Sequence, residues 1–422
     1  MMERKMIVGE RIMYIDSSTS LNCVFTVRIR GSLQPAKLNA ALSKLQKKHP
    51  SLQSVIKNYG QGIPYLVLSP VLAEIPVRKV ERLNDEHWMV ESKAEWGKLF
   101  EEKDSPLARV VWLWSTEVSE LMLVCPHCIC DGRSMATLMG ELLAVLDDPE
   151  KELLAYPPFK SVQALLSEKY SINKQIKMRL LSVLALWFFL TRSKGRKSVA
   201  GDNYMLHWKL DAKNTSAIVA ACKRTGTTVH AVLCVAFLEA FRLVQGENAR
   251  GRVVMPVDIR RFVPEIKDDM MFALAPTLEV IADQDAGLDF WAKVKKVKEE
   301  LVSKIAGLNG REWLLMSEYF SSYQIVRYLK ESEGTHDVTL SNMGRLGIAE
   351  QYHSFELETI YSPSVAFPWK NPNTMVVSTF RGEMDFMFCS NEAFLKEEEA
   401  MVIRQRTIGL LLQGAEAGYA AV

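Results

Sequence analysis

The chain has 422 residues, a length that suits two domains or two fused halves better than one simple core. Hydrophobic residues make up 48% and charged residues 24%, as in ordinary soluble proteins, and a net charge of +2 gives no global field that would favour nucleic acid. The seven cysteines are irregularly spaced, which favours free thiols in a reducing cytoplasm. We find no signal sequence and no stretch of roughly 18 to 20 apolar residues that would span a membrane, so a cytoplasmic location is expected.

Strands and helices are expected to alternate over residues 1–170, which we take as the first half of the chain. The apolar residues from Leu38 to Leu45 recur at helical spacing, and Pro50 stops that helix. The other expected helices cover 85–98 and 133–146, and the expected strands 20–30, 63–69, 75–80, 108–114 and 120–128.

Residues 202–422 form the expected second half, which also mixes strands with helices. A helix over 212–226 ends at Gly226, and Thr227 or Thr228 caps the next one, over 229–244. A long helical region is expected over 288–329 and a final helix over 396–413. Strands are expected at 204–210, 251–261, 272–282, 337–344, 374–382 and 383–390, so the fold class is α/β (α+β).

A basic and apolar linker over 171–201 separates the halves. Two interpretations stay open: a buried connecting helix, or a helix that lies in a membrane interface. In the second, basic residues of the stretch 174–197 meet anionic headgroups while its apolar centre enters the lipid boundary. The apolar residues are Leu180, Leu181, Leu184, Trp187 and Phe188, and the basic ones Lys174, Lys177, Arg179, Arg192, Lys194, Arg196 and Lys197.

The stretch "LVCPHCICDGRSM", Leu123 to Met135, gathers one histidine, three cysteines and one aspartate at an expected strand end. Side chains alternate between faces on a strand, so Cys128 and Cys130 would face away from His127. We therefore expect no metal site, and small buried thiols rather than a redox pair.

His127, Asp131 and Gly132 remain as the chemically useful part of this stretch. An imidazole at the last strand position suits a general base at neutral pH, although a satisfied core histidine is the simpler interpretation. Asp131 is expected to point into the protein, where a buried carboxylate needs a cation, and Arg260 in "PVDIRR" is the obvious donor. Gly132 is expected to allow a sharp turn that a Cβ would strain.

These residues resemble the H-x-x-x-D-G signature of the chloramphenicol acetyltransferase-like superfamily. That superfamily includes condensation domains, polyketide-associated (Pap-type) acyltransferases and alcohol acetyltransferases, with roles in lipid or secondary metabolite biosynthesis. Further matches occur in the family order: "LNAALSKLQKKHPSLQS", "DSPLARVVW", "PVDIRR" and "TLSNMG". The family's double histidine is here Pro126 and His127, which suggests a branch away from typical condensation domains.

The resemblance implies two similar halves in a V, with a tunnel at their interface and His127 midway along it as the catalytic base. Asp131, Gly132 and Arg260 would be structural, with a salt bridge between Asp131 and Arg260. Ser341 and Asn342 are candidates for stabilising the oxyanion or binding substrate. No metal and no bound cofactor are implied; an acyl-CoA or an acyl carrier protein thioester would be the cosubstrate.

The leading hypothesis is a stand-alone enzyme that transfers an acyl group from such a thioester to a hydroxyl, giving an ester. Three alternatives stay open: transfer to an amine giving an amide, a degenerate binding protein of the same fold, and an interaction protein with basic membrane contacts. The expected partners are the thioester donor, an alcohol or amine acceptor, an acyl carrier protein and a membrane surface contacted through 174–197, with no nucleic acid.

Overall fold

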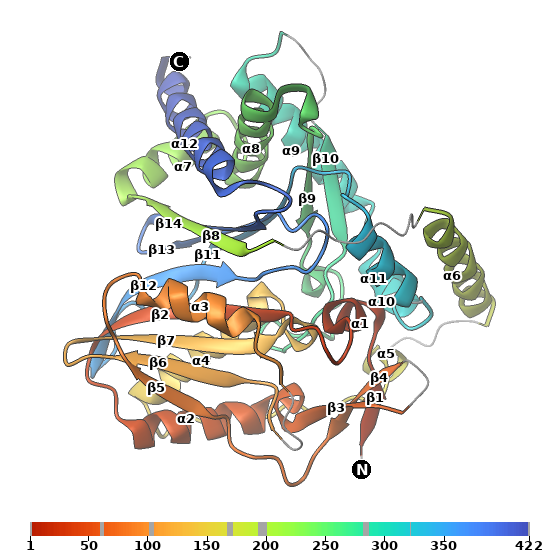
Figure 1. Ribbon diagram of the computed structural model, residues 1–422, viewed down its shortest axis with the longest axis vertical. Helices are drawn as coiled ribbons and strands as arrows, with labels where there is room; N and C mark the ends of the chain where they lie inside the picture. The colour runs from red at the N-terminus through yellow and green to blue at the C-terminus, as the bar shows by residue number, and fades with distance from the viewer. Residues whose placement is uncertain are drawn as a thin grey trace.

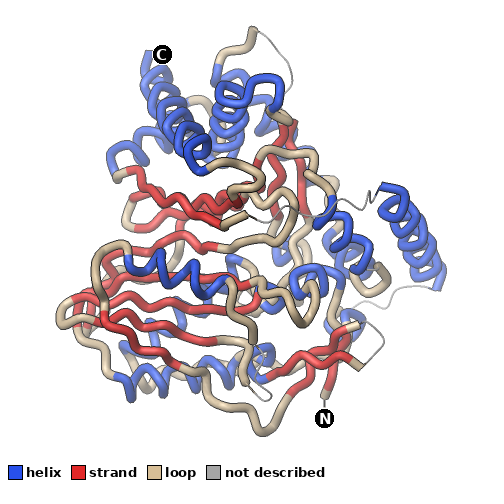
Figure 2. The backbone as a smooth tube through the Cα atoms, viewed as in Figure 1, coloured by secondary structure: helices blue, strands red, loops and turns tan. Residues whose placement is uncertain are grey.

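Two large β-sheets, a small third sheet and their covering helices make up the computed structural model (Figure 1; Figure 2). It describes residues 2–59, 63–100, 105–166, 172–192, 201–281, 287–320 and 322–420. The mixed α/β class is as the sequence predicts.

The five-stranded sheet has the order β12-β2-β7-β6-β5 and belongs mainly to the first half of the chain. Only β5 and β6 run parallel. Leucines at 38, 42 and 45 are buried under this sheet on one helix, as their spacing predicts, and that helix ends just before Pro50. The elements are β2 (Asn22–Gly31), β5 (Val77–Glu81), β6 (Arg109–Trp114), β7 (Val118–Pro126), β12 (Phe355–Ser364), α2 (Pro35–Lys48), α3 (His87–Trp96) and α4 (Gly132–Asp147).

The six-stranded sheet has the order β10-β9-β11-β13-β14-β8 and lies above the first in Figure 1. Helices cover its outer face, and Thr228 caps one of them by accepting a hydrogen bond from the backbone N–H of Ala231 at 3.2 Å. The elements are β8 (Asn203–Leu210), β9 (Arg252–Pro256), β10 (Thr277–Ile281), β11 (Val338–Arg345), β13 (Thr374–Phe380), β14 (Glu383–Asn391), α7 (Ala212–Arg224), α8 (Val229–Gln245), α9 (Phe290–Ala306) and α12 (Glu397–Ala420).

The long helical region expected over 288–329 is instead broken into three helices. Asn309 begins a new one, because its side-chain oxygen accepts a hydrogen bond from the N–H of Glu312 at 3.1 Å. The remaining elements are β1 (Glu3–Lys5), β3 (Ser54–Asn58), β4 (Pro64–Leu68), α1 (Val8–Tyr14), α5 (Val162–Leu165), α6 (Ile172–Arg192), α10 (Gly310–Met316), α11 (Ser322–Glu331) and the 3-10 turns η1 (Pro50–Gln53), η2 (His127–Ile129), η3 (Gly246–Asn248) and η4 (Ile259–Arg261).

Strand β12 was not expected from the sequence, and it connects the two halves. It lies late in the chain yet pairs with β2 in the sheet of the first half. Leu357 and Ile360 on this strand are 0% and 1% exposed within the first hydrophobic core. The chain division at 171–201 stays a prediction, and β12 shows that a strand from the second half joins the sheet of the first half.

Helix α8 is the one helix, in the part of the chain that the structure describes, whose length and composition would let it cross a membrane. The matching stretch, Val229–Asn248, is 56% buried, and Phe237 and Phe241 on it belong to the second hydrophobic core. This burial explains its apolar composition by packing against α9 and α12.

Candidate active site

The histidine of the motif stands just beyond the end of β7. That strand ends at Pro126, and residues 127–129 form a single 3-10 turn before α4 begins. Our expectation that His127 occupies the last strand position is therefore wrong by one residue. The alternation of faces that separated His127 from Cys128 and Cys130 does not apply here, because these residues have left the strand.

Two backbone contacts fix the position of His127. Its N–H donates to the carbonyl of Leu21 at 2.8 Å, and its Nδ1 lies 2.8 Å from the carbonyl oxygen of Cys130. A carbonyl can only accept, so Nδ1 carries the proton and the neutral ring has its lone pair on Nε2. His127 as a whole residue is partly exposed, and its ring lies 5.7 Å, centroid to centroid, from that of Phe367. This is the tautomer that a general base acting through Nε2 requires.

Three cysteine sulphurs gather beside this histidine. Cys23 on β2 is directly opposite Cys125 on β7, and Cys130 approaches both of them. The hydrogen bond from the Cys130 thiol lowers the pKa of Cys23, burial raises it, and His127 lowers it again, to about 5. Burial lowers the pKa of His127, whereas Cys23 and the Cys130 carbonyl raise it, to about 9. The pairing of Cys23 with His127 therefore favours the imidazolium form.

Asp131 both caps α4 and pairs with Arg260 from the second half. One carboxylate oxygen accepts from the backbone N–H of Ser134 at 2.7 Å, and the other lies 2.7 Å from Nη1 of Arg260. Arg260 is 5% exposed, and it also donates to Asp258 at 3.1 Å and to the carbonyl of Met270 at 2.8 Å. The structure thus brings together the two residues that the sequence predicts to pair. Arg260 lies in η4, after the end of β9, instead of on the strand as expected.

Gly132 does not have the backbone conformation that we expected of it. It is the first residue of α4 and is absent from the glycines with positive φ. A Cβ added there would lie 3.4 Å from Sδ of Met343, which is ordinary van der Waals contact. The idea that a Cβ would strain this turn is therefore wrong, although the contact shows that β11 passes beside the motif.

Ser341 and Asn342 lie on β11, both just before the bulge that shifts its register between Asn342 and Gly344. Asn342 uses its side-chain oxygen to accept from the N–H of Gly344 at 2.9 Å, and Gly344 has a φ of 66°. Both Ser341 and Asn342 are partly buried. Their role towards an oxyanion stays a prediction.

Two neighbours of His127 could not be found from the sequence. Cys23 comes from the first strand of the sheet, and Phe367 from the connection between β12 and β13, where it stacks on Trp369 at 6.2 Å. The only sequence signal was the aromatic pair on either side of Pro368 in "AFPWKNP". Over the described ranges, no group of three or more His, Cys, Asp or Glu residues is placed to hold a metal ion.

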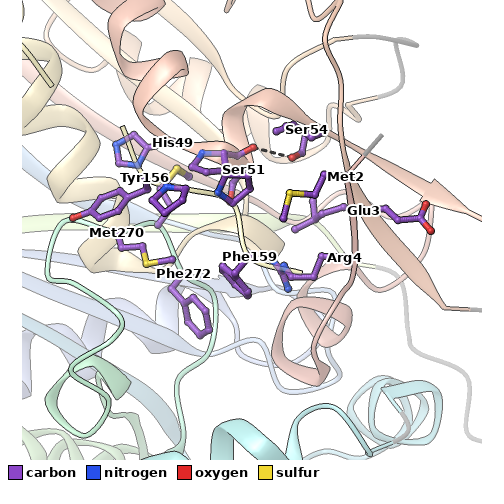
Figure 3. A pocket seen from close by; sticks show the side chains of 16 residues that line it. Met2, Glu3, Arg4, His49, Ser51, Ser54, Tyr156, Phe159, Met270 and Phe272 are labelled. Carbon is purple, nitrogen blue, oxygen red and sulfur yellow. Dashed lines mark hydrogen bonds between the residues drawn. The ribbon is translucent and has the colours of Figure 1, made fainter. Parts of the chain in front are cut away.

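A separate pocket, with a cavity volume of about 50 Å³, lies between the small sheet and the segment 270–272 (Figure 3). His49 lines it, with Nε2 2.8 Å from a carboxylate oxygen of Glu141 and with an Nδ1 that has no partner in the part described. His127 is not among its lining residues, so this cavity is not the expected tunnel, which stays a prediction.

Comparison with family models decides the family. A model described as the condensation domain matches residues 13–248, more than half of the chain. The chain belongs to the condensation-domain family. A model of the C-terminus of phthiocerol/phthiodiolone dimycocerosyl transferases matches residues 203–387. The resemblance to the chloramphenicol acetyltransferase-like superfamily is thereby confirmed.

Curated relatives match only part of this condensation-family chain. One subunit of the plipastatin synthase of Bacillus subtilis is 26% identical over 243 residues, which is 55% of this chain and 9% of that protein. The hybrid synthetase mycA of Thermothelomyces thermophilus is 26% identical over 168 residues, 39% of this chain and 4% of that protein. The chain thus spans less than a tenth of the length of either relative.

Solved structures match the fold over almost its whole length. Polyketide synthase associated protein 5 from Mycobacterium tuberculosis has a TM-score of 0.69 at 15% identity, covering 97% of this chain and 98% of that one. A trichothecene 15-O-acetyltransferase from Fusarium sporotrichioides has a TM-score of 0.74 at 14% identity, covering 98% and 95%. These similarities show the two-halved fold of condensation and acyltransferase enzymes.

Proposed function

We propose that this chain is an acyltransferase that moves an acyl group from a CoA or carrier-protein thioester to a hydroxyl, with His127 as the general base. Membership of the condensation-domain family supports acyl transfer in general. The observation that carries the proposal is the Nδ1 contact of His127 with the Cys130 carbonyl, because it leaves Nε2 as the basic atom.

In the proposed reaction, Nε2 of His127 accepts the proton of the acceptor hydroxyl while its oxygen attacks the thioester carbonyl. The tetrahedral intermediate then collapses, the carbon–sulphur bond breaks, and the imidazolium returns the proton to the departing thiolate. The proposal needs no bound cofactor and no metal. Ser341 and Asn342 are proposed donors to the oxyanion, since β11 passes beside the motif at Met343.

Hydroxyl acceptors are favoured by the strong structural similarity to an enzyme described as an O-acetyltransferase. Amide formation is the second candidate, and the condensation-domain match over residues 13–248 favours it. A neutral amine and a hydroxyl each lose a proton as they attack, so the same base serves both.

The test is thiol release from a panel of acyl-CoA and acyl-pantetheine thioesters, with alcohols, amines or water as acceptors and with product mass measured. We expect wild-type protein to form esters and His127→Ala to lose activity while it stays folded, because the described contacts of the ring are local ones with the Cys130 carbonyl, Cys23 and Phe367. His353→Ala is the matched control, since that side chain is 90% exposed.

Three outcomes would contradict the proposal. A His127→Ala variant that keeps more than a few per cent of the rate would reject the general base. Wild-type protein that binds thioesters but releases no thiol with any acceptor would identify a degenerate binding protein instead. Amide products alone would move the assignment to amine acceptors.

A further inference from the structure

Helix α6 lies at the edge of the molecule, against α10 and α11 (Figure 1; Figure 2). Met178 is 2% exposed and marks the side of α6 that faces the protein. The sequence alone did not decide whether this segment is a buried connecting helix. Because the other side of α6 is exposed, the described helix is not buried. The side chains of Lys174, Phe188 and Arg192, and residues 193–200 with Lys194, Arg196 and Lys197, lie outside the described part.

The outer side of α6 is apolar along the described helix except at Asn173, which is exposed near its N-terminal end. At about 100° per residue its six most exposed apolar side chains fall within about 120° of the circumference, and Met178 is opposite their centre. Leu181, which is 37% exposed, lies outside this stripe. The six residues, which we call the α6 stripe, are Ile172 (75% exposed), Ile176 (51%), Leu180 (62%), Val183 (61%), Leu184 (63%) and Trp187 (69%).

Positive charge borders the α6 stripe on both sides. Lys177 and Arg179 are exposed, and by the same helical geometry they project beyond opposite edges of the stripe. The Arg179 guanidinium lies 5.7 Å from the ring of Tyr319, so its stem follows the protein surface. No Asp or Glu occurs between residues 172 and 192. An apolar stripe on one side of a helix, with cations at its edges, complements a flat surface that has an anionic outer layer over an apolar interior.

We propose that the α6 stripe docks this protein on the surface of an anionic lipid bilayer, with α6 parallel to the membrane plane. Apolar side chains enter the boundary between headgroups and acyl chains, and the flanking cations meet lipid phosphates and carboxylates. The helix lies on the membrane and does not span it, because Lys174, Lys177 and Arg179 precede its apolar run, and the run from Leu180 to Leu190 is too short to cross a bilayer. This inference is independent of the proposed acyl transfer.

A protein partner is the alternative occupant of the α6 stripe, and charge complementarity distinguishes it from a lipid bilayer. A second copy of this chain would place the cations of one stripe against those of the other, with no carboxylate on either α6 to offset them. An anionic bilayer offers negative charge at every position around the helix. The membrane therefore matches both the apolar and the charged part of this surface.

Co-sedimentation with sucrose-loaded vesicles tests the proposal on the full chain. We expect binding to vesicles of 70% phosphatidylcholine and 30% phosphatidylserine, at least about tenfold weaker binding to pure phosphatidylcholine, and a severalfold loss between about 0.05 and 0.5 M salt. Leu184→Glu/Trp187→Glu should abolish binding, and Lys177→Glu should weaken it while keeping the apolar stripe.

The matched control is Val71→Glu/Leu154→Glu, which places the same charges at apolar residues that are 76% and 87% exposed elsewhere. This control should sediment like wild type. No sedimentation of wild type, equal binding to both vesicle types, or unchanged binding of the Leu184→Glu/Trp187→Glu variant would overturn the proposal. So would a wild-type dimer in solution that this variant splits, because the stripe would then belong to a second copy.

Discussion

The sulphur of Cys23 is the largest influence that raises the pKa of His127. Burial acts in the opposite direction, because an imidazolium loses hydration in the interior. The proposed general base works in its neutral form, so with a pKa of about 9 we expect the rate to rise with pH up to about that value. The contact between Cys23 and His127 thus sets the pH range in which the proposed general base is neutral.

We predict that Cys23→Ala shifts the rise of kcat/KM to lower pH, towards the ordinary histidine value of about 6.5 or below it, because burial then acts on the pKa of His127 against backbone hydrogen bonds alone. The measurement is kcat/KM against pH for wild type and variant. Cys234→Ala makes the same substitution at a buried cysteine of the second core and should leave the profile unchanged. A Cys23→Ala profile that superimposes on wild type would show that this sulphur does not tune the base.

At the scale of elements, Asp131 couples the first turn of α4 to η4 in the other half of the chain. It caps the helix through Ser134 and neutralises the buried Arg260. The two roles can be separated, because asparagine keeps a capping oxygen but carries no charge.

We predict that Asp131→Ala lowers the free energy of unfolding by about 3–5 kcal/mol, because it leaves Arg260 partly unpaired, with only Asp258 as a carboxylate partner. Asp131→Asn should cost about 1 kcal/mol less, which is the usual contribution of an N-cap. Urea unfolding followed by circular dichroism measures both. Equal losses for the two variants would assign the whole effect to charge, and a loss below about 1 kcal/mol for Asp131→Ala would show that the pair adds little.

Elements with local signals are the ones that the sequence predicts well. Leu38 to Leu45 and Thr228 indicate their helices through spacing and capping, and "HCICDG" is contiguous, so His127 and Asp131 were found directly. Arg260 was reachable because a buried carboxylate requires a cation. Cys23 and Phe367 were missed, since only the pairing of distant strands and the course of the loop before β13 bring them to the histidine.

Strand β12 shows why the remaining elements could not be predicted. Its register against β2 shifts between Leu357 and Thr359, so the simple alternation of apolar and polar residues is lost. Glu356 and Glu358 make it look like a surface loop, yet they pair with Arg381 at 2.6 Å and with Arg30 at 2.5 Å. Pro363 also argues against a strand in the sequence, although a proline is tolerated at a sheet edge, where β12 lies.

On the scale of the whole molecule, the two halves are joined by contacts to which each half contributes one partner. The ion pair of Asp131 with Arg260 joins them at the motif, and Tyr361 of β12 stacks on Trp88 of α3 at 4.0 Å. Strand β12 also supplies Leu357 and Ile360 to the core of the first half. The site at His127 therefore depends on residues from both ends of the chain.

We predict that residues 1–192 expressed alone aggregate, whereas the same fragment co-expressed with residues 201–422 gives a soluble one-to-one complex. Without β12, the fragment exposes the backbone edge of β2, which is a template for pairing with other chains, and it uncovers the core that Leu357 and Ile360 fill. Size-exclusion chromatography and thermal unfolding measure both states. A Leu357→Ala/Ile360→Ala variant of the second fragment should weaken the complex, because it truncates two of the side chains that β12 contributes to this core. A soluble, monomeric 1–192 fragment that unfolds cooperatively by itself would contradict this view. Its sheet would then be stable with four strands, and β12 would be dispensable for the fold of the first half.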